Sequence, residues 1–266
     1  MSFIRRYVRN ILKQLAFYLS DRGLLPKHFS VRIKVARIFR NKQLLWDSDG
    51  YWFVSPMPSE DQLDYYYTNI YWNNRVGKNS LIDIRDISHW LLLLQNISGI
   101  NSSSKKLRCL NFGAGHGGIS YLLFAMGHEV VNVEPSGLPV NLGERFSTLH
   151  SLKLIQGEFD LVYGSHNLEH VQNLNEFMKL ISRHLHPQGY VFFEVPNCRQ
   201  SNQIEPKNGG QNGKLLEPHT YYFTIDYFKS LNSRAIINST YKGGAISKDE
   251  DGEVIRYLGQ GQPVVN

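Results

Sequence analysis

Apolar runs and amphipathic segments alternate along the second half of the chain. Four short apolar runs predict buried strands: Leu107–Phe112, Val130–Glu134, Leu161–Tyr163 and Tyr190–Val195. Segments with helical periodicity lie between them, at Gly117–Met126 and after Asn173, which has Glu176 at the capping-box position. This alternation predicts an α/β fold in which helices cover both faces of a parallel sheet. Two late segments predict a closing antiparallel pair of strands, Ala235–Tyr241 and Val254–Leu258.

The N-terminal part of the chain has a different pattern. Residues 3–19 repeat apolar positions at helical spacing and predict an amphipathic helix. The opposite face of this helix carries the basic residues Arg5, Arg6, Arg9 and Lys13. A second basic stretch follows at 31–42, and residues 51–56 predict a short strand that ends at a proline.

Residues 65–72 are rich in tyrosine and precede a long apolar helix, expected from Ser80 to Ile97 with Asp83 in its first turn. The tyrosines could form an aromatic lid over a ligand or a helix packed on the edge of the sheet. The polar run at 101–106 has the composition of a linker. We therefore expect three parts: a basic helical extension at 1–43, a cap or lid segment at 44–105 and a core at 106–266.

The net charge of +6 is unevenly distributed. Residues 1–43 contain eleven lysines and arginines and one acid, a net charge of +10, whereas residues 44–266 carry −4. This distribution argues against a nucleic-acid partner, because a nucleic-acid enzyme would more often have a basic body as well. The basic amphipathic helix suggests peripheral contact with an anionic membrane through residues 1–42. Packing of its apolar stripe on the acidic body or on a second subunit is the alternative.

Cysteine content and hydropathy bear on the location of the protein. The two cysteines, Cys109 and Cys198, cannot make a disulfide scaffold or a four-thiolate zinc site. No uncharged apolar stretch approaches the roughly 18 residues that a membrane-spanning helix needs. The basic N-terminus also lacks the apolar segment of a secretory signal. A cytoplasmic location is therefore expected, at the inner membrane surface if the N-terminal helix binds lipid.

The strongest motif joins a glycine-rich turn to an acidic residue one strand later. The strand at 107–112 runs into Gly113-Ala-Gly-His-Gly117, and the next strand ends at Glu134, twenty-one residues after Gly113. Glycines allow a tight turn and close approach of a ligand, and the helix that follows offers free N–H groups. A carboxylate at Glu134 can accept both hydroxyls of an adenosine ribose. Dinucleotides and S-adenosylmethionine are both bound by this arrangement.

The later segments distinguish the two cofactors. Phe159–Val171, Leu185–Asn197 and His219–Thr224 occur in order, a series that resembles class I S-adenosylmethionine-dependent methyltransferases, especially the bacterial group that acts on sugars and small metabolites. The resemblance covers roughly residues 50–260. It implies a Rossmann-like seven-stranded sheet, mostly parallel with an antiparallel last strand, and S-adenosylmethionine as cofactor. The implied acceptor is a small molecule or glycan, such as a sugar in surface-polysaccharide synthesis. An NAD-dependent oxidoreductase is a more distant alternative.

The same resemblance assigns the candidate cofactor-binding residues Asn111, Gly113, Gly115, Gly117 and Glu134. The glycines would cradle the cofactor and Glu134 would hold its ribose. Asn111 stands where the family usually has aspartate, so it can order the loop but brings no charge. A non-catalytic methyltransferase-like module, used for membrane docking or assembly, is therefore the alternative function.

Three further histidines, of the ten in the chain, belong to later motifs. His166-Asn-Leu-Glu-His170 fits the H-x-x-E-H pattern of a zinc protease class, but that pattern needs a long helix and here directly follows a strand, so no metal is expected. The resemblance places His166 near the sulfonium of the cofactor, and His170 is expected to be structural or pocket-lining. His219 matches the proposed base of sugar C-methyltransferases, although Pro218 separates it from Glu217. The candidate catalytic residues are thus His219 and His166; packing of His219 under the helix after Thr224 is the alternative.

Overall fold

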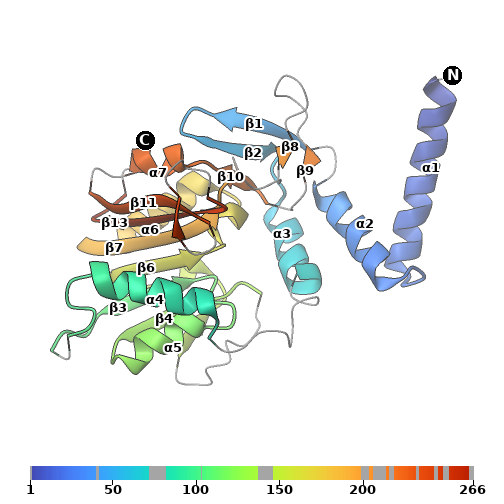
Figure 1. The fold of residues 1–266 in the computed structure, drawn as a ribbon. Coiled ribbons are helices and arrows are strands. Elements are labelled where there is room, and N and C mark those ends of the chain that lie inside the picture. The colour runs from blue at the N-terminus through green and yellow to red at the C-terminus, as the bar shows by residue number, and fades with distance from the viewer. Residues whose placement is uncertain are drawn as a thin grey trace.

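An eight-stranded sheet forms the centre of the molecule (Figure 1). The structure is a computed structural model that describes residues 2–39, 42–71, 82–102, 104–136, 146–198, 204–205, 214–215, 219–231, 234–242, 245–247 and 252–263. The strands lie in the order β12-β11-β13-β7-β6-β3-β4-β5. Their bounds are β3 (Arg108–Phe112), β4 (Glu129–Val133), β5 (Ser147–Leu149), β6 (Phe159–Ser165), β7 (Leu185–Pro196), β11 (Ala235–Lys242), β12 (Ala245–Ile246) and β13 (Val254–Gln260).

The strand directions confirm the expected α/β fold. Strands β5, β4, β3, β6 and β7 are parallel, whereas β13 is antiparallel to both of its neighbours, β7 and β11. The sheet has one strand more than the expected seven, because the two-residue β12 pairs with the end of β11. Chain order reverses at β3, which lies between β4 and β6. Ligands of such sheets bind at this reversal, beyond the carboxyl ends of the strands.

Helices cover both faces of the sheet and bury two apolar clusters. On one face, α6 (Leu174–His184) and α7 (Ile225–Leu231) pack on side chains that include Leu110, Val162 and Phe193. On the other face, α4 (Ile84–Asn96) and α5 (Gly118–Ala125) pack on Cys109, Leu161 and Phe192. Successive strand residues therefore belong to opposite clusters, as the period of two in a strand requires.

Helix α4 packs with the core although it precedes the polar run at 101–106. Its side chains Leu92 and Leu93 are buried in the same cluster as β3 and β6. Asp83 is its N-cap rather than a first-turn residue, and forms a capping box with Asp86. The expected start at Ser80 lies outside the described residues. Helix α4, which lies in the segment expected at 44–105, therefore shares an apolar cluster with the strands of the core.

A three-stranded antiparallel sheet lies beside the main sheet (Figure 1). It consists of β1 (Gln43–Asp47), β2 (Tyr51–Ser55) and β10 (Tyr221–Phe223), and β10 pairs with β2 across most of the chain length. The sequence predicted β2 but not β1. The β1–β2 turn needs Gly50, which has a φ of +99° and whose Cβ would lie 2.6 Å from the backbone nitrogen of Tyr227. A two-stranded sheet joins β8 (Ile204–Glu205) and β9 (Lys214–Leu215).

The N-terminal helices α1 (Ser2–Asp21) and α2 (Lys27–Phe39) stand beside the body, with α1 farthest out (Figure 1). The expected amphipathic helix is thus confirmed. Side chains on α2 pack with α3 (Glu60–Tyr66) and the π-helical turn Tyr67–Tyr71 in a small cluster. Tyr66, Tyr67 and Tyr71 belong to this cluster with α2, whereas Tyr65 is 42% exposed, and Trp72 lies outside the described residues. None of the helices in the described ranges is long and apolar enough to cross a membrane.

Candidate active site

The carboxyl ends of β3, β4 and β6 line a cavity of about 1460 Å³. The structure brings all seven sequence-predicted site residues to its wall: Asn111, Gly113, Gly115, Gly117, Glu134, His166 and His219. The wall also includes Tyr66, Tyr67 and Tyr71. The cavity therefore lies where strand order reverses and combines the glycine loop, the acidic residue and the histidines.

The glycine loop has a backbone that other residues rarely adopt. The φ angles of Gly113, Gly115 and Gly117 are +65°, +55° and +78°. A Cβ at Gly113 would overlap the side-chain amide of Asn167, whose Nδ2 donates to the carbonyl of Phe112 at 2.7 Å. The missing side chains leave the backbone open to a ligand, and Gly117 caps the N-terminus of α5.

Glu134 is buried at the end of β4 and contacts this loop directly. Its Oε2 accepts a hydrogen bond from the backbone N–H of Gly115 at 2.8 Å, and its Oε1 accepts one from Ser136 at 3.1 Å. Each carboxylate oxygen has two lone pairs, so one on each oxygen remains for a neighbouring hydroxyl. Glu134 therefore orders the loop and can bind a diol at the same time.

Asn111 joins three elements beneath the loop. Its Nδ2 donates to Ser120 Oγ at 2.7 Å, and Ser120 Oγ donates to Asn132 Oδ1 at 2.6 Å. All three side chains are buried, on β3, α5 and β4 respectively. An amide that donates a hydrogen bond and needs no counter-charge suits this position, so Asn111 contributes order rather than charge.

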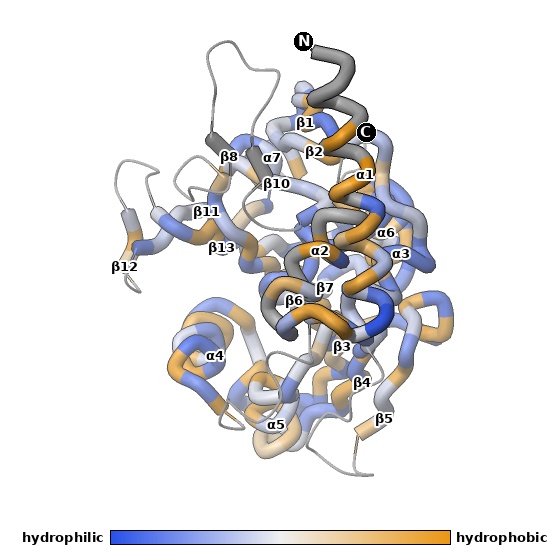
Figure 2. The backbone as a smooth tube through the Cα atoms, turned by 90° about the vertical axis from the view of Figure 1, so that its right-hand side faces the viewer, coloured by the Kyte–Doolittle hydropathy of each residue, from blue (hydrophilic) through white to orange (hydrophobic). Residues whose placement is uncertain are grey.

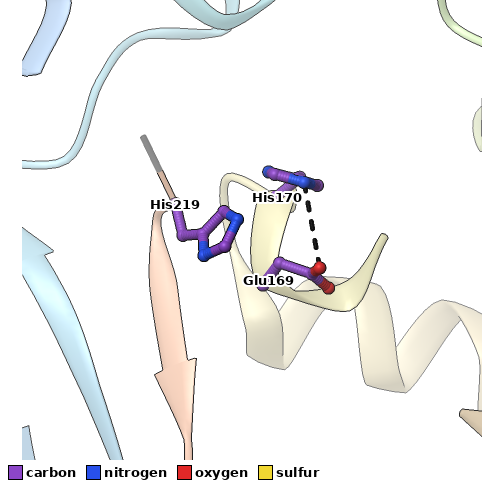
Figure 3. A group of neighbouring side chains, drawn as sticks. All are labelled: Glu169, His170 and His219. Carbon is purple, nitrogen blue, oxygen red and sulfur yellow. Dashed lines mark ion pairs between the residues drawn. The ribbon is translucent and has the colours of Figure 1, made fainter. Parts of the chain in front are cut away.

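The histidines gather after β6 and before β10 (Figure 3). His170 belongs to the 3-10 turn η5 (Leu168–His170), and its Nδ1 is 2.7 Å from the hydroxyl of Tyr67. The rings of His170 and His219 meet edge to face with centroids 4.7 Å apart, and both face Glu169. Because the 166–170 run follows a strand and ends in a single 3-10 turn, it does not form the helix that the zinc-protease pattern requires.

His166 lies between two buried carboxylates and has an unusual backbone φ of +55°. Its Nδ1 is 3.4 Å from Glu169 Oε1, and its Nε2 is 3.3 Å from Glu194 Oε1. Burial alone would lower the pKa of His166, but the attraction of Glu169 and Glu194 raises it to about 9. Burial would likewise raise the pKa of Glu169, but His166, His170 and His219 lower it to about 2.

A buried ionic network below His166 was not predicted from the sequence. Glu194 Oε2 accepts from Arg256 Nε at 2.7 Å and lies 2.7 Å from His89 Nε2, while His89 Nδ1 is 2.6 Å from the Tyr163 hydroxyl. The signal for it is Glu194 itself, a charged residue inside the apolar run Val191–Val195. A carboxylate in such a strand needs buried partners.

Comparison with known sequences decides the family. The sequence profile of a methyltransferase domain matches residues 82–235, more than half of the chain. The chain belongs to the methyltransferase-domain family. It is an S-adenosylmethionine-dependent methyltransferase, as the motifs indicated, and the match gives no support to an oxidoreductase. The site fits this cofactor, because the side-chain-free loop and the remaining lone pairs of Glu134 can receive an adenosyl group. No curated protein sequence matches the chain.

A solved methyltransferase structure shows the same fold. A 1,6-didemethyltoxoflavin-N1-methyltransferase from Burkholderia thailandensis, solved with its substrate and S-adenosylhomocysteine, is 13% identical with a TM-score of 0.53. The match covers 82% of this chain and 99% of that chain. The N-methyltransferase NodS from Bradyrhizobium japonicum WM9, solved with S-adenosylhomocysteine, is 12% identical with a TM-score of 0.45, over 76% of this chain and 97% of that one.

Proposed function

We propose that this methyltransferase acts on a sugar or glycoconjugate bound beside the histidines, with the cofactor on the glycine loop. The observation that carries the proposal is that one cavity wall includes both Glu134, at the end of β4, and His219, just before β10. Glu134 would hold the ribose, and Gly113, Gly115 and Gly117 would approach the rest of the cofactor. Asn111 would keep β3 and α5 in place beneath it.

The residues on the acceptor side supply alignment and proton removal. When bound, S-adenosylmethionine supplies a methyl group activated by a sulfonium. An acceptor hydroxyl forms the new bond to that methyl carbon, the carbon–sulfur bond breaks, and its electron pair stays on sulfur. His219 would take the hydroxyl proton, a role suited to imidazole near neutral pH. His166, held as a cation by Glu169 and Glu194, would fix the position of Glu169 instead of acting as a base.

The aromatic wall supports a sugar as acceptor. Tyr66, Tyr67 and Tyr71 pack against one another with centroids 5.0–6.2 Å apart and line the cavity. Aromatic rings pack on the apolar faces of sugar rings, and the tyrosine hydroxyls can form hydrogen bonds with the hydroxyl groups of a sugar. A flat heterocycle, the kind of substrate bound by the Burkholderia enzyme, is the competing acceptor.

Methyl transfer from labelled S-adenosylmethionine to a panel of nucleotide sugars and to flat nitrogen heterocycles tests this proposal. Label should appear on at least one sugar and depend on Glu134 and His219. Label on heterocycles alone would contradict the sugar assignment while leaving the methyltransferase intact.

We also propose that α1 binds an anionic membrane surface. Five of its apolar side chains are 48–59% exposed: Val8, Ile11, Leu12, Leu15 and Tyr18. These residues therefore do not pack on the acidic body of the same chain, and apolar positions recur along α1 among polar ones (Figure 2). Residues 1–43 carry +10 against −4 for the remainder, the asymmetry expected of a lipid-binding extension.

A further inference from the structure

Glu169 is a buried carboxylate without hydrogen bonds among the described residues. Its side chain is 1% exposed, and neither Oε1 nor Oε2 accepts a hydrogen bond from a described group. The nearest nitrogens, His166 Nδ1 and His170 Nε2, lie 3.4 and 3.9 Å from Oε1. His166 is a positive partner at ion-pair distance, but because neither carboxylate oxygen accepts a hydrogen bond from a described group, both oxygens remain available to a second positive partner.

The groups around Glu169 have the geometry of a metal site. Glu169, His170 and His219 each offer one ligand atom, and these atoms all lie within 4.8 Å of one another (Figure 3). All three residues line the cavity, so a bound ion would have a face open toward a substrate. The hydroxyl of Tyr67 lies 2.7 Å from Nδ1 of His170, which leaves Nε2 on the side of Glu169. Such an outer contact fixes the orientation of a ligating imidazole.

We propose that Glu169, His170 and His219 bind a divalent transition-metal ion such as Zn²⁺. Two imidazoles and one carboxylate form a donor set that such ions accept, and catalytic sites with three protein ligands keep a position for substrate. This proposal departs from the expectation of no metal drawn from the sequence. That expectation considered only a site in which both histidines of the 166–170 run lie on one helix. In the proposed site the second histidine ligand is His219, from a segment far along the chain.

The role of the ion rests on the proposed methyl transfer. An ion held by Glu169, His170 and His219 would lower the pKa of an acceptor hydroxyl beside it, so that the hydroxyl could give its proton to water in the cavity. The oxygen then forms its bond to the methyl carbon as the carbon–sulfur bond breaks. His219 would be a metal ligand in this state, rather than the base itself.

Metal binding can be measured without an acceptor. Purified full-length protein without an affinity tag is treated with a chelator, dialysed and titrated with Zn²⁺ by calorimetry, and with Co²⁺ by visible absorption. We expect one ion per chain and a Co²⁺ spectrum of low-symmetry nitrogen and oxygen coordination. Glu169→Gln and His219→Ala should each weaken Zn²⁺ binding about a hundredfold or more, because losing even an outer-shell partner costs 10–100-fold. His184→Ala, at a histidine of α6 outside the cavity wall, should bind Zn²⁺ as the wild type does.

Binding of S-adenosylhomocysteine by the same preparations separates this proposal from the proposed function. Variants that bind it normally are folded, so their loss of Zn²⁺ would be specific to the site. No Zn²⁺ binding, or binding equally tight in both cluster variants, overturns the metal site and leaves the methyltransferase proposal standing. Zn²⁺ binding that depends on Glu169 and His219, without any methyl transfer to a sugar, would support the site and contradict the proposed acceptor.

Discussion

The backbone N–H of Gly115 donates a hydrogen bond to Glu134 Oε2 at 2.8 Å. This bond ties the loop after β3 to the carboxylate that ends β4, and Gly113 N–H reinforces it by donating to the carbonyl of Val133 at 2.7 Å. The acidic residue proposed to bind ribose therefore also sets the shape of the loop proposed to receive the rest of the cofactor. Such a prearranged site loses less entropy when a ligand binds.

Substitution of Gly113 should disrupt both stability and cofactor binding. A side chain at this position would be strained by the positive φ and would overlap the side chain of Asn167. Gly127 has a φ of +90° but an added Cβ would meet nothing within 4 Å, so this position isolates the cost of the backbone conformation. Gly127→Ala should destabilise by about 1–2 kcal/mol and keep S-adenosylhomocysteine binding. Gly113→Ala should destabilise by more and lose binding, measured by urea unfolding and calorimetry. Equal effects of the two variants would show that the contact with Asn167 is unimportant.

His219→Ala should reduce turnover far more than cofactor binding. His219 lies against His170, away from the contact between the glycine loop and Glu134. Loss of a general base, or of the metal ligand that replaces it, should reduce kcat by about 10²–10⁴-fold. Steady-state kinetics on the identified acceptor and calorimetry with S-adenosylhomocysteine give the two quantities, with His184→Ala as control. Full activity in His219→Ala would place proton removal elsewhere.

Glu194 should contribute a large, pH-dependent part of the stability. Burial alone would raise its pKa, but His166 and His89 beside it hold the pKa far below the ordinary 4.5. Its stabilising effect is therefore complete above pH 4.5 and declines as the pH falls further below that value. Glu194→Gln should cost about 3–5 kcal/mol near neutral pH, because it leaves a buried arginine unpaired.

The surface pair Arg108–Glu129, 2.9 Å apart, provides the matched control for Glu194. Glu129→Gln should cost about 0–1 kcal/mol. Urea unfolding at neutral pH and below pH 4.5 compares the two variants with the wild type. The loss of unfolding free energy in Glu194→Gln should be smaller in acid. A deficit that grows on acidification would mean that Glu194 is protonated in the folded protein.

The apolar face of α1 should govern membrane binding. Each basic residue near an anionic surface contributes about 1 kcal/mol to the free energy of membrane binding, and the apolar side chains contribute more by inserting into the lipid. Full-length protein should float with anionic vesicles at low salt, and the double variant Leu12→Glu, Leu15→Glu should not. Leu91→Glu, at a similarly exposed leucine on α4, should float like the wild type. If the wild type ignores vesicles and instead dimerises through these leucines, a second copy is the partner of α1.

Local patterns predicted the elements whose signals are contiguous in the sequence. The apolar runs of β3, β4, β6 and β7 and the glycine turn identify the sheet, and Asn173 caps α6 as expected. The end of α6 is less clear from the sequence: the apolar periodicity after Asn173 continues to Leu185, but α6 ends at His184 and Leu185 pairs with Phe159 at the start of β7. Strand pairing with a partner strand outweighs the helical periodicity there.

Features that depend on distant partners could not be read from the sequence. Strand β1 became recognisable only through its pairing with β2, which in turn pairs with β10. The partners of Glu194 lie 105 residues before it, at His89, and 62 residues after it, at Arg256. The meeting of His170 and His219 likewise depends on how the chain returns from β7 to β10. A charged residue in an apolar strand indicates that it has buried polar partners, but it does not identify them.

Calorimetric titration of S-adenosylhomocysteine into wild-type protein and Glu134→Ala tests the central claim most directly. Two charge-assisted hydrogen bonds to ribose hydroxyls should make the variant weaker by about 2–4 kcal/mol in binding free energy. Glu158→Ala, at an exposed glutamate outside the cavity wall, is the control and should bind as the wild type does. A wild type that binds S-adenosylhomocysteine and a Glu134→Ala variant that binds it equally tightly would contradict the proposed cofactor site.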